Sequence, residues 1–167
     1  LCLKLVRYKT ENKELLSYLL FEVEDEAHYI AGIESYITEA FSEINTQSYF
    51  YIRKSIRKIL RVTKRFIRYS SEKETEVILL LHFCKTLENF TPSIKESVAM
   101  MNLYHRQIAL IEKKLGGLHE DLQYDYSQSH PAGLETLDLD ETISRLSAME
   151  SKGRRRLHEN GMSNEDI

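Results

Sequence analysis

The residues best placed to do chemistry are basic side chains between Tyr49 and Tyr69. Eight Lys or Arg residues occur there, and no Asp or Glu occurs between Asn45 and Ser71. A helix turns about 100° per residue, which brings five of the bases onto one arc. We call this arc the basic face: Arg53, Arg57, Arg61, Lys64 and Arg68. Such a face binds carboxylates or phosphates, so it predicts a negatively charged partner.

Two partner chemistries fit the basic face. RNA or DNA would place its phosphates on the bases and stack on Tyr49, Tyr51 or Tyr69. However, the chain has a net charge of −3 and a pI near 6.1, whereas nucleic-acid-binding domains are usually basic overall. We therefore expect a non-enzymatic binding or scaffold module that contacts an acidic protein partner. RNA or DNA binding is the alternative, and a homo-oligomer stays open.

A third explanation of the basic residues is pairing within the chain. Residues 11–43 contain nine acidic residues and a single base, Lys13. This acidic region directly precedes the basic one. The two could pair along a shared edge, although an exposed ion pair contributes only about 0–1 kcal/mol.

An acidic cluster raises the question of a metal site. Glu22, Glu24, Asp25, Glu26 and His28 resemble in composition the carboxylate and histidine ligands of di-metal helical bundles. Those bundles use Glu-x-x-His pairs, and no histidine here follows a Glu at that spacing. Acidic residues also favour the first turn of a helix. A carboxylate-histidine metal protein is thus a second alternative, and we predict no metal and no cofactor.

A small buried polar site is predicted from His105, His119 and Tyr124. His105 falls on an apolar stripe between Met101 and Ile108, which would turn it inward. The sequence contains no Gly-x-Ser-x-Gly, no glycine-rich phosphate loop and no Cys-x-x-Cys. We therefore assign no catalytic residue.

The elements that position these residues are predicted to be helices. Apolar residues recur every three or four positions, and the chain has only two prolines and six glycines. We predict an all-α fold, either an antiparallel helical bundle or a short α-α superhelix, of about five helices plus a C-terminal helix. The predicted core is Leu16, Leu19, Leu20, Ile30, Ile33, Ile37, Phe41, Ile56, Ile59, Ile67, Leu80, Leu81, Cys84, Met101, Ile108 and Ile111.

Several helix ends are predicted from local signals. Ser71 and Glu74 have the spacing of a capping box, which would open a helix over 72–89. Pro92 suits the first position of the next helix. The apolar stripe keeps its register across Gly116 and Gly117, which predicts one long helix to about Tyr126.

The predicted domains are a helical domain over 10–127 and, over 128–167, a linker, an appended helix and a flexible tail. Cys2 and Cys84 give no disulfide framework, and no apolar run reaches the roughly 20 residues that span a bilayer. We therefore expect a cytoplasmic protein with no membrane segment.

Overall fold

The described part of the chain is an all-α bundle, as the sequence predicts. The computed structural model describes residue 4 and residues 7–128. Two elements are not α-helices: η1 is a π-helix and η2 a 3₁₀ turn. In chain order the elements are α2 (Thr10–Ser17), η1 (Tyr18–Glu22), α3 (Glu26–Ser42), α4 (Tyr49–Ser70), α5 (Lys73–Glu88), η2 (Ile94–Glu96), α6 (Val98–Leu115) and α7 (Glu120–Gln128). Among the described residues, no helix is long and apolar enough to cross a membrane.

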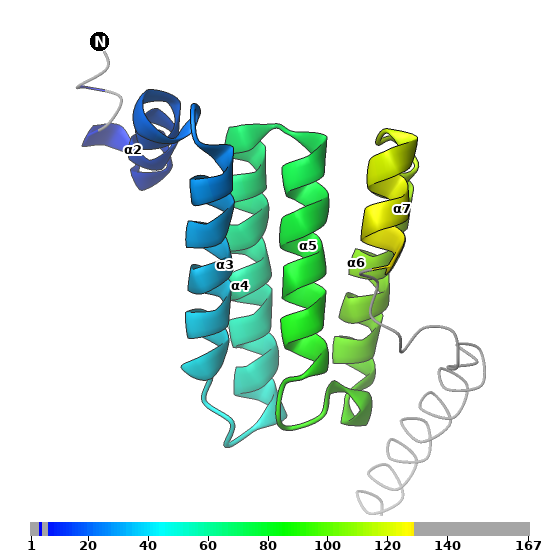
Figure 1. Ribbon diagram of the computed structural model, residues 1–167. Coiled ribbons are helices and arrows are strands. Elements are labelled where there is room, and N and C mark those ends of the chain that lie inside the picture. The colour runs from blue at the N-terminus through cyan, green and yellow to red at the C-terminus, as the bar shows by residue number, and fades with distance from the viewer. Residues whose placement is uncertain (1–3, 5–6, 129–167) are drawn as a thin grey trace, which may run out of the picture. The chain divides into compact units, whose positions relative to one another are not determined.

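Helices α3 to α6 run alternately up and down (Figure 1). The first three pack against one another, whereas α6 packs mainly on α5. Helix α5 is therefore central, and it buries Val77, Leu79, Leu80, Leu81, Phe83, Cys84 and Leu87. Residues 77–81 form an unbroken apolar run, so this part of the helix must be covered on every side, which explains why α5 takes the middle position.

Most of the predicted core is buried. The confirmed positions are Ile33, Ile37, Phe41, Ile56, Ile59, Ile67, Leu80, Leu81, Cys84, Met101, Ile108 and Ile111. Leu16 and Ile30 are only half-buried. The prediction was wrong for Leu19 and Leu20, which are 51% and 62% exposed. Their neighbour Tyr18 is buried in their place, with its ring 4.6 Å from that of Tyr29.

The predicted capping box at Ser71 does not form. Ser71 has φ 61° and ends α4 in the left-handed conformation, with its N–H bonded to the Ile67 carbonyl. It therefore belongs to the end of α4 and cannot cap α5. The residue before α5 is Glu72, whose side chain makes no capping bond. Its backbone N–H donates instead to Ser70 Oγ at 3.2 Å.

The single long helix predicted from Pro92 to Tyr126 is wrong at both ends. Pro92 lies in the connecting loop, and α6 begins only at Val98. The helix stops at Leu115, and after the glycine pair the chain starts the separate helix α7 (Figure 1). Tyr126 Oη donates to Glu74 Oε1 at 2.6 Å, which holds α7 against the first turn of α5. The break falls at the glycine pair, and the bond from Tyr126 to α5 stabilises α7 as a separate helix despite the continuous apolar pattern.

The chain divides into two units, Leu1–His130 and Pro131–Ile167. The predicted helical domain over 10–127 falls within the first unit. The linker, appended helix and tail predicted over 128–167 lie, from residue 129 on, outside the described residues.

Candidate binding groove

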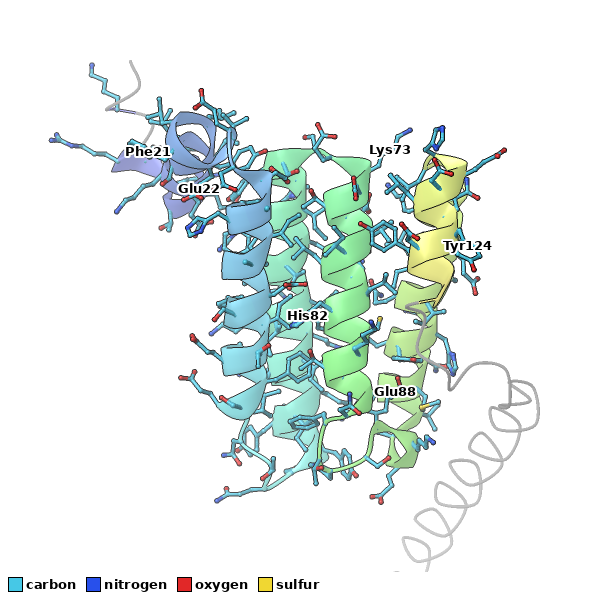
Figure 2. The ribbon with its side chains drawn as sticks, viewed as in Figure 1. Phe21, Glu22, Lys73, His82, Glu88 and Tyr124 are labelled. Atoms are coloured by element: carbon cyan, nitrogen blue, oxygen red, sulfur yellow. The ribbon has the colours of Figure 1, made fainter. Side chains whose placement is uncertain are left out.

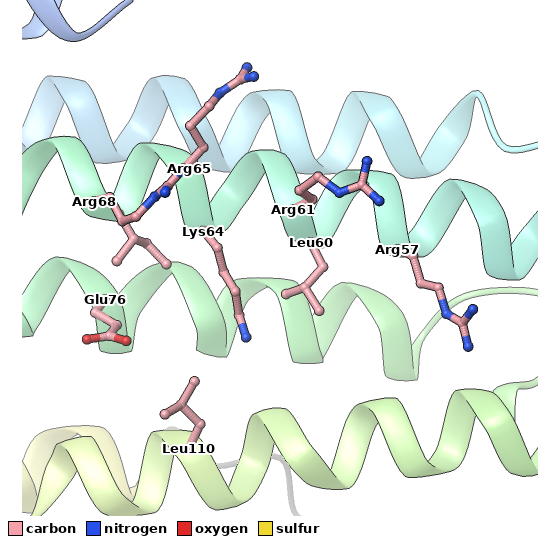
Figure 3. Close-up of a pocket in the computed structure, with 9 residues that line it drawn as sticks. Arg57, Leu60, Arg61, Lys64, Arg65, Arg68, Glu76 and Leu110 are labelled. Carbon is pink, nitrogen blue, oxygen red and sulfur yellow. The ribbon is translucent and has the colours of Figure 1, made fainter. Parts of the chain in front are cut away.

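A groove runs along α4 because α6 packs on α5 rather than on α4. Helix α5 lies between them, so α4 and α6 form the two sides of the groove and α5 lies between these sides (Figure 3). The groove has a volume of about 600 Å³. It is lined by Arg57, Leu60, Arg61, Lys64, Arg65, Ile67, Arg68, Glu76 and Leu110.

One wall of the groove is the basic face predicted from the sequence. Arg57, Arg61, Lys64 and Arg68 all line it. Together they cover about 16 Å of helix, at roughly 1.5 Å per residue. Arg53, the fifth predicted residue, lies one turn earlier on α4 and does not line the groove. The structure thus brings four of the five residues together.

The arginines of this wall are available for a ligand. Within the described residues no ion pair involves Arg57, Arg61 or Arg68, and Arg57, Arg61 and Arg68 are exposed. Arginine also presents a planar fork of donors that matches a carboxylate.

Lys64 and Glu76 make the inner part of the groove polar. The Lys64 side chain points toward α5 (Figure 3) and is half-buried, and this burial lowers the pKa of its ammonium while the Glu76 carboxylate partly opposes the shift. Glu76 itself is 2.6 Å from Lys114 Nζ of α6. This ion pair links α5 to α6 beside the groove.

Leu60, Ile67 and Leu110 make the rest of the groove apolar. Leu60 and Ile67 come from α4, and Leu110 projects from α6 toward α5 (Figure 3). The groove therefore joins an apolar floor to a cationic rim. Sequence reasoning missed Leu110 and Glu76 because neither lies near the basic run in the chain.

Arg65 differs from the other basic residues of α4 because it forms an ion pair with a carboxylate of its own chain. Its guanidinium points away from α5 (Figure 3), and Nη2 donates to Glu14 Oε1 at 3.0 Å. A second carboxylate, Glu11, places its Oε1 3.9 Å from Arg65 Nη1. The predicted pairing between the acidic and basic regions is thus realised at this one arginine within the described residues. Helix α3, which carries three of the nine acidic residues, forms no ion pair with α4 within the described residues.

Glu26, from the proposed metal cluster, is occupied by hydroxyl groups. Its Oε1 accepts hydrogen bonds from Ser70 Oγ and Thr75 Oγ1, each at 2.6 Å, and Oε2 accepts one from Tyr18 Oη at 2.9 Å. Asp25 caps α3 by accepting the backbone N–H of His28. Within the described residues, no three His, Cys, Asp or Glu side chains are grouped to hold a metal ion. The geometry therefore gives the metal alternative no support.

The predicted polar site of His105, His119 and Tyr124 is not buried. The His119 side chain is 75% exposed and Tyr124 is 67% exposed on the outer side of α7 (Figure 2). His105 is half-buried on α6, where burial lowers its pKa. The prediction of one buried site was wrong because the chain breaks at Gly116, which separates α7 from the face that carries His105.

A His–Glu–Thr cluster joins α3 to α5 and was not expected from the sequence. His82, half way along α5 (Figure 2), has Nε2 3.1 Å from Thr38 Oγ1 and Nδ1 3.6 Å from Glu34 Oε1. The order Thr38, His82, Glu34 resembles the nucleophile, base and acid of a catalytic triad. However, the Thr38 hydroxyl donates its proton to the Glu34 backbone carbonyl at 3.0 Å, which leaves none for His82 to take. The cluster therefore acts as a link between two helices.

The tyrosines considered for base stacking have other partners. Tyr49 Oη donates to Glu96 Oε2 at 2.7 Å, and Tyr69 Oη donates to Glu14 Oε2 at 3.0 Å. Tyr51 is half-exposed near the start of α4, beside Phe50. None of the three lines the groove.

Comparison with known proteins gives no further guide to function. No protein-family model matches the chain, and no curated protein or solved structure matches it. The chemistry of the groove is therefore the evidence on which a function rests.

Proposed function

We propose that the protein is a non-enzymatic binding module whose groove holds an acidic amphipathic helix of a protein partner. The observation that carries this proposal is an apolar floor beside three exposed arginines that form no ion pair with any described residue. Carboxylates of the partner pair with Arg57, Arg61 and Arg68. Its apolar side chains cover Leu60 and Leu110.

The length of the basic wall sets the length of the ligand. About 16 Å of helix corresponds to roughly 11 residues, or three turns. A helix lying along α4 presents apolar residues every three or four positions to the floor, with Asp or Glu on its flanks. An extended peptide would expose unpaired backbone groups to the apolar floor, which costs free energy.

Nucleic acid fits the groove less well. Tyr49 and Tyr69, the residues that could stack on bases, donate hydrogen bonds to carboxylates instead. The apolar side chains of the floor also cannot donate hydrogen bonds to phosphates.

The test is selection of helical peptides from a random display library, about 12 residues long to match the groove. The full chain is the bait, and Arg57→Glu/Arg61→Glu protein removes non-specific binders. We expect enriched sequences with apolar residues at helical spacing and Asp or Glu beside them. The affinity of the best peptide is then measured by fluorescence anisotropy. Arg57→Glu/Arg61→Glu should lower that affinity at least tenfold.

The matched control is Lys54→Glu/Lys58→Glu, which reverses two exposed bases of the same helix outside the groove. This variant should bind the peptide within about twofold of the unchanged protein, because surface charges away from the site act weakly. No enrichment, or enriched sequences without acidic residues, would overturn the proposal. So would tighter binding of short RNA or DNA at about 50 mM salt, which would favour the nucleic-acid alternative.

We also propose that the protein works in the cytoplasm. Cys84 is a free and fully buried thiol. Burial raises the pKa of that thiol to about 12, so it is unreactive. A chain with a free thiol and no disulfide framework suits a reducing compartment.

A further inference from the structure

A small pocket opens where η1, α3 and α4 meet, and it has a volume of about 220 Å³. We call it the aromatic pocket, and the residues that define it are Glu22, Tyr29, Gly32, Tyr36 and Phe66. None of these residues lines the groove. A ligand of the aromatic pocket is therefore independent of the proposed function.

Three aromatic rings form the walls of the aromatic pocket. Tyr29 and Tyr36 lie seven positions apart on α3, which places them two turns apart on one side of the helix. Phe66 comes from α4, and its ring centroid lies 6.1 Å from that of Tyr36 with an interplanar angle of 76°. The Tyr29 hydroxyl donates to the Phe66 backbone carbonyl at 2.9 Å, which fixes the Tyr29 ring against α4. Contacts within the chain thus position the rings before a ligand binds.

The space between the rings exists because residue 32 is glycine. Gly32 lies between Tyr29 and Tyr36 on the same side of α3, three positions from one and four from the other. A Cβ at this position would meet no heavy atom within 4 Å. Glycine is unfavourable inside a helix, and nothing in the packing around this position requires it. Its missing side chain leaves the middle of the pocket open.

One carboxylate lies beside the rings without a partner. Glu22 is half-buried at the end of η1, beside the start of α3 (Figure 2). Within the described residues its side chain forms no ion pair and accepts no hydrogen bond. Burial raises the pKa of Tyr29, and the charges of Glu26 and Glu22 add to that shift. The aromatic pocket thus has a negative charge at one end that no described residue neutralises.

Aromatic faces together with an unpaired carboxylate favour a cation. The face of an aromatic ring is the negative part of its quadrupole, and it attracts ammonium and guanidinium groups. One such contact is already present, because the Arg65 guanidinium lies 5.7 Å from the centre of the Phe66 ring. Arg65 does not line the aromatic pocket, and its charge is balanced by Glu14. The Glu22 carboxylate is therefore left for a cation from outside the chain.

We propose that the aromatic pocket binds a methylated ammonium group. Tyr29, Tyr36 and Phe66 surround its methyl groups, and Glu22 lies beside its charge. A primary ammonium fits less well, because it is strongly hydrated and needs an acceptor for each of its three protons. The pocket offers one free carboxylate for this purpose, and Ile33 makes its floor apolar.

Two sources carry this chemical group. Small quaternary ammonium compounds contain it, and so do trimethyllysine side chains of proteins. The aromatic pocket opens to solvent at His28 and Gly32, which are both exposed, so either source can enter. The shared requirement is a methylated cation.

The test is a titration of the full chain with tetramethylammonium at constant ionic strength, followed by ¹H–¹⁵N NMR with the Gly32 amide as reporter. We expect saturable shifts with a dissociation constant of about 1 mM or tighter, a range open to a ligand of so few atoms. Choline is then compared with 3,3-dimethylbutanol, which has the same shape without the charge. The neutral compound should bind at least fivefold more weakly.

Matched pairs of variants show whether the aromatic pocket is responsible. Gly32→Leu fills the pocket and should abolish binding, whereas Ala31→Leu adds the same side chain outside the pocket and should leave the affinity within twofold. Tyr36→Leu removes a ring and should lower the affinity at least fivefold, whereas Tyr36→Phe keeps the ring and should bind normally. Circular dichroism of each variant checks that the helices are intact.

The carboxylate is tested in the same way. Glu22→Gln should lower the affinity at least threefold. Glu24→Gln is the control, because Glu24 is exposed and does not line the pocket. Choline and a short trimethyllysine peptide then identify the source. Tighter binding of choline assigns a free compound, and tighter binding of the peptide than of choline and of its unmethylated form assigns a protein side chain.

Three results would overturn the proposal. The first is the absence of saturable shifts with tetramethylammonium. The second is equal binding of choline and its neutral analogue, which would mean that the pocket takes apolar groups and not cations. The third is unchanged binding by both Gly32→Leu and Tyr36→Leu, which would place the ligand elsewhere. Peptide binding in the groove would stand in each case, since the two sites share no residue.

Discussion

Arg65 Nε lies 2.9 Å from Glu14 Oε2, and both side chains are about one-quarter exposed. One hydrogen bond belongs to this ion pair, from Arg65 Nη2 to Oε1 of the same carboxylate at 3.0 Å. Tyr69 Oη donates a second hydrogen bond to Glu14, at Oε2. This contact removes one arginine from the cationic rim and fixes the N-terminal helix to α4.

Replacing Glu14 with Gln should loosen the N-terminal helix without unfolding the bundle. The change removes the charge that Arg65 pairs with, and it leaves one amide nitrogen facing a guanidinium. We expect a loss of about 1 kcal/mol in the free energy of unfolding, in the range for a partly exposed ion pair. Hydrogen exchange should rise in residues 10–22 and stay unchanged in α5.

The control for this prediction is Glu112→Gln, an exposed carboxylate of α6 for which the described residues provide no ion pair. It should change the free energy of unfolding by less than about 0.5 kcal/mol. Equal effects of the two substitutions would show that the Arg65 pair contributes nothing specific.

Glu26→Gln should destabilise the protein more than Glu14→Gln. Three hydroxyl groups from η1, α4 and α5 donate to the Glu26 carboxylate. An amide offers a single acceptor oxygen, so at least one of Tyr18, Ser70 and Thr75 loses its partner. Hydrogen bonds to a charged group contribute about 1.5–3 kcal/mol, so we expect a loss of about 2 kcal/mol in urea unfolding. A loss below that of Glu14→Gln would contradict the shared role of this carboxylate.

The sequence is sufficient to predict the orientation of helices whose opposite faces differ strongly in polarity. In α4 the apolar and basic residues separate cleanly, so its buried side and its basic face both follow from helical spacing. In α5 the unbroken apolar run over 77–81 predicts its central position. Where Tyr18 competes with Leu19 and Leu20 for burial, spacing is not sufficient. A π-turn and a tyrosine hydroxyl that bonds to Glu26 decide the outcome there.

The groove itself could be predicted only in part. Its cationic rim lies within one helix and is visible in the sequence. Its floor depends on α6 packing on α5, which brings Leu110 into the same groove as Leu60 from fifty residues away. No local pattern encodes that choice, because α6 has an apolar stripe that would suit either neighbour.

Gly116→Ala should stabilise the protein rather than disrupt it. Gly116 has φ −60°, and a Cβ there would lie 3.8 Å from its nearest neighbour, the Lys113 carbonyl oxygen. The break after α6 therefore does not require glycine. Alanine restricts the unfolded chain, so we expect a gain of about 0.5 kcal/mol in thermal or urea unfolding. A loss of more than about 1 kcal/mol would mean that the turn depends on glycine's conformational freedom.

Stability should fall at alkaline pH because several buried groups resist ionisation. Burial raises the pKa of Tyr69 to about 12, aided by its bond to Glu14, and burial raises that of Cys84 also to about 12. Tyr29, Tyr104 and Tyr126 shift in the same direction for the same first cause. In the unfolded chain a tyrosine ionises near 10.0 and a cysteine near 9.0. The folded state therefore binds more protons above pH 9.

The direction of this pH dependence follows from the linkage between proton binding and folding. Stability is fully present below the unfolded pKa values and is lost as the pH rises from about 9 toward 12, since the unfolded state releases protons first. We expect the urea midpoint to stay level to about pH 9 and then to fall steadily, with tyrosinate absorbance appearing together with loss of helix. Tyr69→Phe should make the fall less steep, because one titrating group is removed. A midpoint that stays constant to pH 12 would contradict the burial of Tyr29, Cys84 and Tyr104 and the partial burial of Tyr69 and Tyr126.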